Sequence, residues 1–413
     1  MIEREKYIYH CINCGNEYSS RDMMYLCPSC SAAPVADAPP RGVLKTVYDY
    51  EKIRRSVPGF KELREEGFIS LLPLDSIESL PPLSTGNTPL CRVYSPDRRK
   101  LPYRLFFKDD SRNPTWSFKD RASALVSAYA VESGLGTIVT ASTGNAGSSL
   151  AGICASQHQR AVVIVPEKAP LAKLTQIVMY GATLVPVRGT YDDAFDLSMK
   201  ASGQFGWYNR NTAYNPLTIE GKKTVSFELF EQMGYKVPDT IFIPAGDGVI
   251  MSGVYKGFED LLRLDIIDHM PVIVAVQSEL SDNLVRNINS ADFTVIASST
   301  IADSISVDIP RNFYMARDFI REYGGKTLTV TDEEILDASA MLAAGTGLFA
   351  EPAAAAAYAG FLAYERNGLI PALSDNIVLL TGSGLKDTAS VQSLIRMPEP
   401  ILPTLDHLAD AVK

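Results

Sequence analysis

Lys119 is the side chain in this sequence whose position best suits a nucleophile. It lies in residues 113–121, NPTWSFKDR, after an aromatic run at 103–107 that predicts a strand and before an alanine-rich segment at 122–132 that predicts a helix. A lysine at such a junction lies at the carboxyl edge of a sheet, where open α/β proteins place their ligands. Taken alone, Lys119 is equally consistent with a solvated charge in the first turn of a helix.

Three glycine-rich loops downstream each follow a predicted strand. Residues 141–147, ASTGNAG, place hydroxyls and backbone N–H groups at a helix N-terminus, which suits an anion such as a carboxylate. Residues 244–250, PAGDGVI, allow the backbone to curl around a phosphate but lack the Lys-Ser/Thr ending of a nucleotide P-loop. Residues 380–387, LTGSGLKD, offer a hydroxyl that could contact an unprotonated ring nitrogen. Each loop alone is also explained as a close-packed turn or a helix cap.

The lysine and the three loops together match the requirements of pyridoxal 5'-phosphate. Lys119 is then the residue that forms the Schiff base, because desolvation lowers the pKa of a lysine and frees its amine to act as nucleophile and later as base. The coenzyme acts as the electron sink. Asp247 is unfavourable beside a phosphate, and we expect its side chain to point away or to cap the helix.

Four of the six cysteines form two C-x2-C pairs near the N-terminus, Cys11, Cys14, Cys27 and Cys30. Four thiolates from two tight turns suit a tetrahedral Zn(II) ion with no open coordination position, so we expect a structural zinc site. The alternatives are a knuckle that has lost its metal and cysteines that pair on oxidation. Cys91 and Cys154 stand alone in apolar surroundings and are expected to be buried structural thiols.

Continuous valine and isoleucine runs alternate with helical patterns after Lys119, which indicates parallel sheets buried on both faces. A chain of 413 residues also exceeds the size at which one core stops growing, so we expect about two to three domains. The sequence predicts a doubly wound α/β protein with two sheets. Strands are expected at 44–48, 137–141, 161–165, 183–187, 240–244, 272–276 and 376–380, with a charged helix at about 50–66.

Composition narrows the possible partners. The formal net charge is −9 and the basic residues are scattered, which argues against a nucleic-acid partner. Residues 1–6 do not begin a signal peptide, and the longest apolar run, 352–363, is too short to span a bilayer. We expect a soluble, cytoplasmic protein with a small-molecule substrate and no membrane partner.

The chain resembles the fold-type II pyridoxal-phosphate enzymes, and most closely their threonine synthase branch. The resemblance covers nearly the whole chain and rests on several motifs in order. These are the cysteine leader ending in YDY at 48–50, GNTPL at 86–90, SFKDR at 117–121, STGN at 142–145, EGKKT at 220–224, EP at 351–352 and TG at 381–382.

The resemblance implies a role for each matching residue. Lys119 corresponds to the Schiff-base lysine, Asn145 to the partner of the phenolic oxygen of the coenzyme, and Thr381 to the group that faces the pyridine nitrogen. Phe118 lies beside the ring. The phosphate-binding loop corresponds to Gly246, Asp247, Gly248, Val249 and Ile250, and the seat of the substrate carboxylate to Ser142, Thr143 and Gly144.

The implied reaction converts O-phosphohomoserine and water to L-threonine and phosphate, and dimers are usual in the family. The implied domains are a zinc-knuckle leader at 1–34, a large coenzyme-binding domain at 35–124 and 216–413, and a small inserted α/β domain at 125–215.

This sequence departs from the family pattern at several positions. Trp116 and Ala122 stand where glycines are common, and Ala146 replaces a frequent threonine. Many threonine synthases place an arginine that holds the substrate phosphate where this chain has Thr218, and a hydroxyl is a weaker phosphate ligand than a guanidinium. The nearby cations that could substitute are Lys173, Arg210, Lys222 and Lys223.

The missing arginine leaves other reactions open. A β-replacement enzyme of the cysteine or cysteate synthase type and a serine or threonine ammonia-lyase would use the same lysine. A non-catalytic protein on this scaffold is a further alternative, which the presence of Lys119, Asn145 and Thr381 disfavours.

Overall fold

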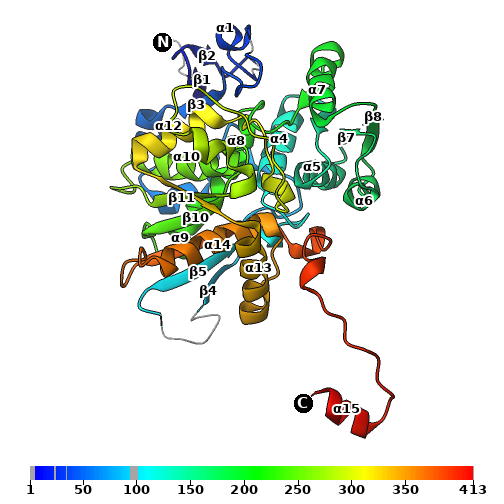
Figure 1. Ribbon diagram of the computed structural model, residues 1–413. Helices are drawn as coiled ribbons and strands as arrows, with labels where there is room; N and C mark the ends of the chain where they lie inside the picture. The colour runs from blue at the N-terminus through cyan, green and yellow to red at the C-terminus, as the bar shows by residue number, and fades with distance from the viewer. Residues whose placement is uncertain (1–4, 23–24, 34, 94–100, 413) are drawn as a thin grey trace.

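The strands form three sheets in the computed structural model, which describes residues 5–22, 25–33, 35–93 and 101–412 (Figure 1). Residues 1–4 and the predicted leader boundary at Pro34 lie outside the described residues. No helix in the described ranges is both long enough and apolar enough to cross a membrane.

The first sheet is a three-stranded antiparallel leader with the order β2-β1-β3. Burial alternates along β1 and β3, so that one face of the sheet packs against the body of the protein. β3 lies beyond residue 34, so the leader sheet continues past the predicted leader. The elements are β1 (Tyr7–Cys11), β2 (Glu17–Ser19), α1 (Pro28–Ser31) and β3 (Leu44–Tyr48).

The second sheet has six strands in the order β12-β11-β10-β13-β5-β4. All neighbours are parallel except β4, which pairs antiparallel with β5 at one edge. The strands are β4 (Leu90–Val93), β5 (Arg104–Asp109), β10 (Thr240–Pro244), β11 (Val272–Ser278), β12 (Lys326–Val330) and β13 (Asp375–Leu380).

Helices cover both faces of this sheet. Ile241 and Ile243 pack into the core that contains α10, whereas Phe242 packs into the core that contains α14. The predicted apolar run at 352–363 forms most of α14, and its small residues let the helix approach the sheet closely, as at Gly360 against Val276. The helices are α4 (Lys119–Glu132), α8 (Leu217–Lys222), α9 (Thr224–Gln232), α10 (Val249–Arg263), α11 (Asn283–Asn287), α12 (Phe313–Tyr323), α13 (Asp332–Thr346) and α14 (Pro352–Arg366).

The third sheet is parallel, with the order β8-β7-β6-β9, and lies beside the large sheet (Figure 1). Helix α7 covers one face, and α5 and α6 cover the other. The elements are β6 (Thr137–Ala141), α5 (Asn145–Ser156), β7 (Arg160–Pro166), α6 (Leu171–Met179), β8 (Thr183–Val187), α7 (Tyr191–Phe205) and β9 (Tyr208–Asn209).

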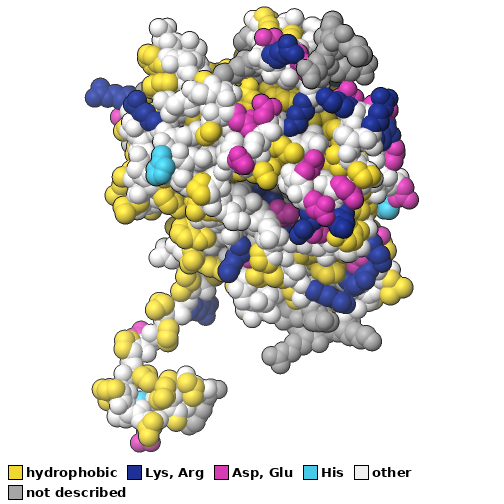
Figure 2. Space-filling view, turned by 180° about the vertical axis from the view of Figure 1, so that it is seen from behind, with side chains coloured by type: hydrophobic (Ala, Val, Ile, Leu, Met, Phe, Trp, Pro, Cys, Tyr) yellow, Lys and Arg dark blue, Asp and Glu magenta, His cyan; other side chains and the backbone are white. Residues whose placement is uncertain are grey.

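The C-terminal segment leaves the body and ends in α15 (Leu405–Ala411), well away from the sheets (Figure 1). Figure 2 shows apolar side chains gathered along this segment, and Met397, Leu402 and Leu405 are exposed. Short 3-10 turns lie at Ile69–Leu71, Ile77–Ser79, Asp110–Arg112, Glu279–Ser281, Asp303–Ile305, Gly384–Lys386 and Gln392–Leu394.

The predicted fold class is confirmed, and all eight predicted strands, including the one at 103–107, occur within one or two residues of their expected ends. The prediction of a single helix at about 50–66 is wrong. It is divided into α2 (Tyr50–Ser56) and α3 (Phe60–Glu65) around Pro58, because proline removes a backbone donor and disfavours a helical residue before it. Cys154 is buried as expected, whereas Cys91 on the edge strand β4 is only half-buried.

Candidate active site

The loop after β13 holds the segment that leads into Lys119. The backbone N–H of Phe118 donates to the carbonyl of Thr381 at 2.8 Å, and the N–H of Ser383 donates to the carbonyl of Trp116 at 3.1 Å. Trp116 has a φ of 65°, a left-handed conformation in which a glycine would be unstrained. Two of the predicted site loops are therefore joined by main-chain hydrogen bonds at the carboxyl edge of the large sheet.

The neighbours of Lys119 in the Lys-Asp-Arg triplet have structural partners. Asp120 is buried and accepts hydrogen bonds from the backbone N–H and the hydroxyl of Thr115 at 2.7 and 2.5 Å. Arg121 is also buried, and its Nε lies 2.6 Å from Asp110 Oδ2. Lys119 is the first residue of α4 and takes part in neither of these contacts.

Lys119 has the electrostatic environment of a reactive amine. Burial lowers the pKa of Lys119, and the nearby positive charge of Arg210 lowers it further, while Glu351 and Asp247 act in the opposite direction. A lowered pKa increases the fraction of neutral amine near neutral pH, and the neutral amine is the form that attacks an aldehyde or accepts a proton.

Asn145 connects the small sheet to the large one. It is the first residue of α5, and its amide donates to Glu351 Oε1 and Oε2 at 3.0 and 3.1 Å and to Ser304 Oγ at 3.3 Å. Glu351 is almost fully buried at the start of α14, and burial raises the pKa of its carboxyl group. Gly382 packs so closely on this carboxylate that an added Cβ would lie 2.5 Å from Oε1.

The predicted carboxylate seat lies at the N-terminus of α5. Ser142, Thr143 and Gly144 are half-buried, and Gly144 occupies the N-cap position. Within the described residues no side chain caps this helix, so its first N–H groups are available for an anion. Ala146 follows Asn145 in the first turn, and its methyl group adds no donor.

The predicted phosphate loop lies at the N-terminus of the long helix α10. Gly248 has a φ of 80°, and an added Cβ would lie 2.8 Å from the Cβ of Ala316. At Gly246 an added Cβ would lie 3.0 Å from the Cα of Ile305. In the described part of the chain no side chain caps α10, which starts at Val249 and Ile250, so this close-packed backbone suits a phosphate.

Asp247 is turned away from the turn that would hold the phosphate. Its Oδ1 accepts from the backbone N–H of Arg311 at 3.0 Å, and its carbonyl accepts from the N–H of Asn312 at 3.2 Å. The side chain therefore points away, as expected, and does not cap α10. It fixes the loop before α12 beside the turn at the start of α10.

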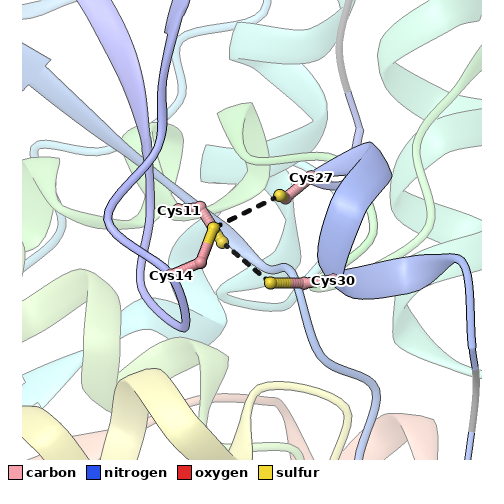
Figure 3. A group of neighbouring side chains, drawn as sticks. All are labelled: Cys11, Cys14, Cys27 and Cys30. Atoms are coloured by element: carbon pink, nitrogen blue, oxygen red, sulfur yellow. Dashed lines mark hydrogen bonds between the residues drawn. The ribbon is translucent and has the colours of Figure 1, made fainter.

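The four N-terminal cysteines form one cluster (Figure 3). All four sulfur atoms lie within 4.8 Å of one another, with Cys11 to Cys30 at 3.8 Å and Cys14 to Cys27 at 3.7 Å. A zinc ion with sulfur ligands at about 2.3 Å separates tetrahedral sulfurs by about 3.8 Å, whereas a disulfide joins sulfurs at about 2.05 Å. The described cysteines are free thiols, and their spacing fits one tetrahedral ion.

Gly42 closes over the second knuckle. It has a φ of 90°, and an added Cβ would lie 3.1 to 3.3 Å from Cys27 and Cys30. Its N–H donates to Asn13 Oδ1 at 2.6 Å, and its carbonyl accepts from the N–H of Cys27 at 2.8 Å. These bonds hold the two knuckles together independently of any ion.

Two contributors to the site were not assigned from the sequence. One is Glu351 as the partner of Asn145, and the other is Lys386. Lys386 Nζ donates to the carbonyl of Thr115, to Ser148 Oγ on α5 and to Gln176 Oε1 on α6, each at 2.9 Å. Burial lowers the pKa of Lys386 to about 8. The contacts of Glu351 and Lys386 depend on how the two sheets pack, and no local sequence signal reveals that packing.

The comparisons with known proteins agree with this geometry. Residues 82–382 match the family described as pyridoxal-phosphate dependent enzyme. A threonine synthase of Methanocaldococcus jannaschii is 34% identical over 92% of this chain and 93% of its own, and one of Methanosarcina acetivorans is 34% identical over 98% and 99%.

Solved structures show the same fold. The processed form of threonine deaminase isoform 2 from Solanum lycopersicum matches with a TM-score of 0.64 and 20% identity, over 76% of this chain and 86% of its own. Maize serine racemase matches with a TM-score of 0.64 and 24% identity, over 79% and 94%. The chain belongs to the pyridoxal-phosphate dependent enzymes of fold type II, on their threonine synthase-like branch.

Proposed function

We propose that this protein is a threonine synthase, a lyase that converts O-phosphohomoserine and water to L-threonine and phosphate. The observation that carries the proposal is the 34% identity to a curated threonine synthase over 98% of this chain, which includes the cysteine leader. The convergence of Lys119 with loops from both sheets supports a reaction on a small amino acid that is held between them.

The proposed coenzyme contacts follow the geometry of the loops. Lys119 would hold the coenzyme through its aldehyde, Phe118 would lie beside the ring, and Thr381 and Asn145 would bind the pyridine nitrogen and the phenolic oxygen. The residues of the α10 turn, Gly246, Asp247, Gly248, Val249 and Ile250, would hold the phosphate. Asp247 would contribute only its backbone, because its carboxylate accepts from the Arg311 N–H.

The proposed chemistry divides between the coenzyme and the chain. The coenzyme supplies an electron sink for negative charge at the substrate α carbon. Lys119 Nζ takes the α proton and moves protons at the β and γ carbons while phosphate leaves and water adds at the β carbon. The open N-terminus of α5, with Ser142, Thr143 and Gly144, orients the substrate carboxylate.

One observation favours a substrate without a phosphoryl group. Thr218, at the position of the phosphate-binding arginine of many threonine synthases, is fully buried and donates its hydroxyl to the carbonyl of Asn215 at 2.7 Å. It is therefore not free to bind a substrate phosphate. The second candidate is a β-replacement enzyme or a serine or threonine ammonia-lyase with the same lysine.

The test is a substrate panel with holoenzyme. O-Phosphohomoserine, O-phosphoserine, O-acetylserine and threonine are supplied in turn while the coenzyme absorbance and released phosphate or ammonia are followed. We expect threonine and phosphate in equal amounts from O-phosphohomoserine, and no product with Lys119→Ala. Faster turnover of O-acetylserine with sulfide, or ammonia from threonine, would assign the second candidate instead.

We also propose that Cys11, Cys14, Cys27 and Cys30 hold one structural Zn(II). The sulfur spacing of a tetrahedral site supports this. We further propose a division into a leader at 1–34, a large domain at 35–124 and 216–413, and a small domain at 125–215. A homodimer and a cytoplasmic location are also proposed.

A further inference from the structure

Arg210 is a fully buried guanidinium, and in the part of the chain that the structure describes its hydrogen-bond acceptors are all uncharged. It follows β9, and its Nε donates to Ser123 Oγ at 3.1 Å, Nη1 to Thr212 Oγ1 at 3.1 Å and Nη2 to the carbonyl of Lys119 at 3.4 Å. A guanidinium has five N–H donors, so these bonds leave two of them for another acceptor. Burial lowers the pKa of Arg210 to about 10.

Lys222 is a second buried basic side chain whose hydrogen-bond partner is uncharged. It ends α8, is fully buried, and its Nζ donates to the carbonyl of Thr218 at 3.2 Å. Burial lowers the pKa of Lys222, and the positive charges of Arg210 and Lys119 lower it further.

Four other fully buried cations among the described residues, Lys108, Arg121, Lys223 and Lys256, are paired with carboxylates. Lys223 lies 2.5 Å from Glu220 Oε2 and 2.6 Å from Asp260 Oδ2. Arg121 is paired with Asp110, and Lys108 Nζ lies 2.6 Å from Glu228 Oε2. Within the described residues, neither Arg210 nor Lys222 forms an ion pair of this kind. Buried charges are ordinarily paired, so two such cations together indicate that an anion completes the site.

The carboxylates nearest to these cations are already bonded elsewhere. Asp247 accepts from the Arg311 N–H, Asp120 from Thr115, and Glu351 from Asn145. The negative charges of these carboxylates still raise the pKa values of Lys119, Arg210 and Lys222 and so partly oppose the effect of burial.

Helix α8 lies between α4, which begins at Lys119, and α10, which begins at the predicted phosphate loop. At Gly221 an added Cβ would lie 2.2 Å from the carbonyl oxygen of Arg121 on α4, and at Gly253 on α10 it would lie 2.6 Å from the Cβ of Lys222. Lys222 thus lies beside the helix that begins at the phosphate loop. It is also one helical turn from Thr218, on the same face of α8.

We propose that Arg210 and Lys222 form the binding site for the acidic leaving group of the substrate, a phosphoryl group, in place of an arginine at Thr218. Arg210 follows β9 of the small sheet, and Lys222 ends α8, which packs against α4 and α10. A phosphoryl group accepts several charge-assisted hydrogen bonds and so uses the donors that both side chains have left. The proposal rests on the proposed function and selects phosphorylated amino acids among its candidate substrates.

The experiment uses holoenzyme of Arg210→Gln, Lys222→Gln and the charge-retaining Arg210→Lys and Lys222→Arg variants. Lys200→Gln is the matched control, since it removes a lysine charge at an exposed position of α7. Spectral titration of the bound coenzyme gives Kd for O-phosphohomoserine and for L-threonine, and inorganic phosphate is tested as a competitor. Coenzyme content and melting temperature are measured for each variant.

We expect Arg210→Gln and Lys222→Gln each to raise Kd for O-phosphohomoserine about 10- to 100-fold, because each removes a charged hydrogen-bond donor. Kd for L-threonine, which lacks an acidic side chain, changes less than about threefold, and Lys222→Arg recovers part of the loss. Inorganic phosphate competes with O-phosphohomoserine in the wild type and loses this effect in the Gln variants.

Three outcomes would overturn the proposal. The first is an unchanged Kd for O-phosphohomoserine in both Gln variants. The second is an equal loss of affinity for O-phosphohomoserine and for L-threonine. The third is loss of coenzyme from the Gln variants, which would assign Arg210 and Lys222 to the coenzyme phosphate. If the Gln variants fail to fold, an unchanged Kd for O-phosphohomoserine in Lys222→Met, which removes the charge without adding a buried polar group, has the same meaning. A wild type that binds phosphorylated amino acids through these residues but makes no threonine would reject the proposed function and keep the anion site.

Discussion

Asn145 donates its side-chain amide to both carboxylate oxygens of Glu351, at 3.0 and 3.1 Å. The bond joins the first residue of α5 on the small sheet to the residue before α14 on the large sheet. The same amide is the proposed contact of the coenzyme phenolic oxygen. Glu351 therefore positions the amide, and the protonation state of its buried carboxyl group affects that bond.

The first prediction concerns Glu351 and pH. Burial raises the pKa of this carboxyl group in the folded protein above its usual value, so the folded state binds the proton more tightly than the unfolded state. The resulting stability is fully present below the ordinary glutamate pKa of about 4.3 and is lost as pH rises through the folded pKa. Each unit of pKa elevation corresponds to about 1.4 kcal/mol.

Urea unfolding of the coenzyme-free protein between pH 4.5 and 8 measures this effect. We expect Glu351→Gln to be more stable than the wild type at pH 8 and close to it at pH 4.5, because the amide is neutral at both. Glu333→Gln, at an exposed site in the first turn of α13, is the control. A pH-independent difference between Glu351→Gln and the wild type would contradict the assigned cause.

The second prediction identifies the lysine that bonds the coenzyme. Lys119, Lys222 and Lys386 are all buried at least in part, and burial lowers the pKa of each, so each is a chemically reasonable nucleophile. Borohydride reduction followed by peptide mass analysis should place the coenzyme on Lys119. Lys119→Ala should abolish the label and the absorbance near the visible edge, and Lys326→Ala at an exposed position should leave both intact. A label on either other buried lysine would reject the site.

The parallel sheets could be predicted because their strands are continuous apolar runs. β10 is buried at every position, and a pattern of that kind is recognisable without knowledge of its neighbours. β12, with the sequence KTLTV, was not predicted because it lies at a sheet edge and alternates polar residues. β9 is only two residues long and is defined by pairing with β6, which is a tertiary contact.

The site could be predicted in part for the same reason. Lys119 and the glycine loops follow strands, so the sheet itself places them at one edge. The contact between Asn145 and Glu351 joins residues 206 positions apart, and it exists because the two sheets pack together. The unpaired state of Arg210 and Lys222 also depends on burial, since in sequence they resemble any surface cations.

The third prediction concerns the cysteine cluster. Elemental analysis of freshly reduced protein should find one zinc per chain, and Cys14→Ser should lower it, because each sulfur is one of four ligands. Cys91→Ser, outside the cluster, is the control and should retain zinc. Protein without bound zinc after purification under reducing conditions would reject the metal site.

Removal of zinc should loosen the leader without loss of the coenzyme spectrum. The leader has its own contact with the body, since the hydroxyl of Tyr48 on β3 donates to Glu220 Oε2 at 2.6 Å. Hydrogen exchange after chelation should therefore rise in β1 and β2 more than in β3. Equal exchange in all three strands would show that the zinc does not order the knuckles.

The last prediction compares two adjacent lysines of equal burial. Lys222 and Lys223 are both fully buried, but Lys223 is paired with Glu220 and Asp260. Lys223→Met removes one cation from this buried network, leaving Glu220 with the Tyr48 hydroxyl and Asp260 with Lys256, and should lower the free energy of unfolding by about 3–5 kcal/mol. Lys222→Met removes a cation short of partners and should leave the free energy of unfolding unchanged or raise it by about 1–3 kcal/mol.

Urea unfolding in buffer without phosphate tests this comparison, and the same variants in phosphate extend it. An anion that binds the native wild type at 100 times its Kd adds about 2.7 kcal/mol of stability, and Lys222→Met should gain less. Lys223→Met should keep the full gain, because its charge belongs to the ion-pair network with Asp260. If Lys222→Met is destabilised as strongly as Lys223→Met and phosphate stabilises both equally, then Lys222 is a structural cation and binds no anion.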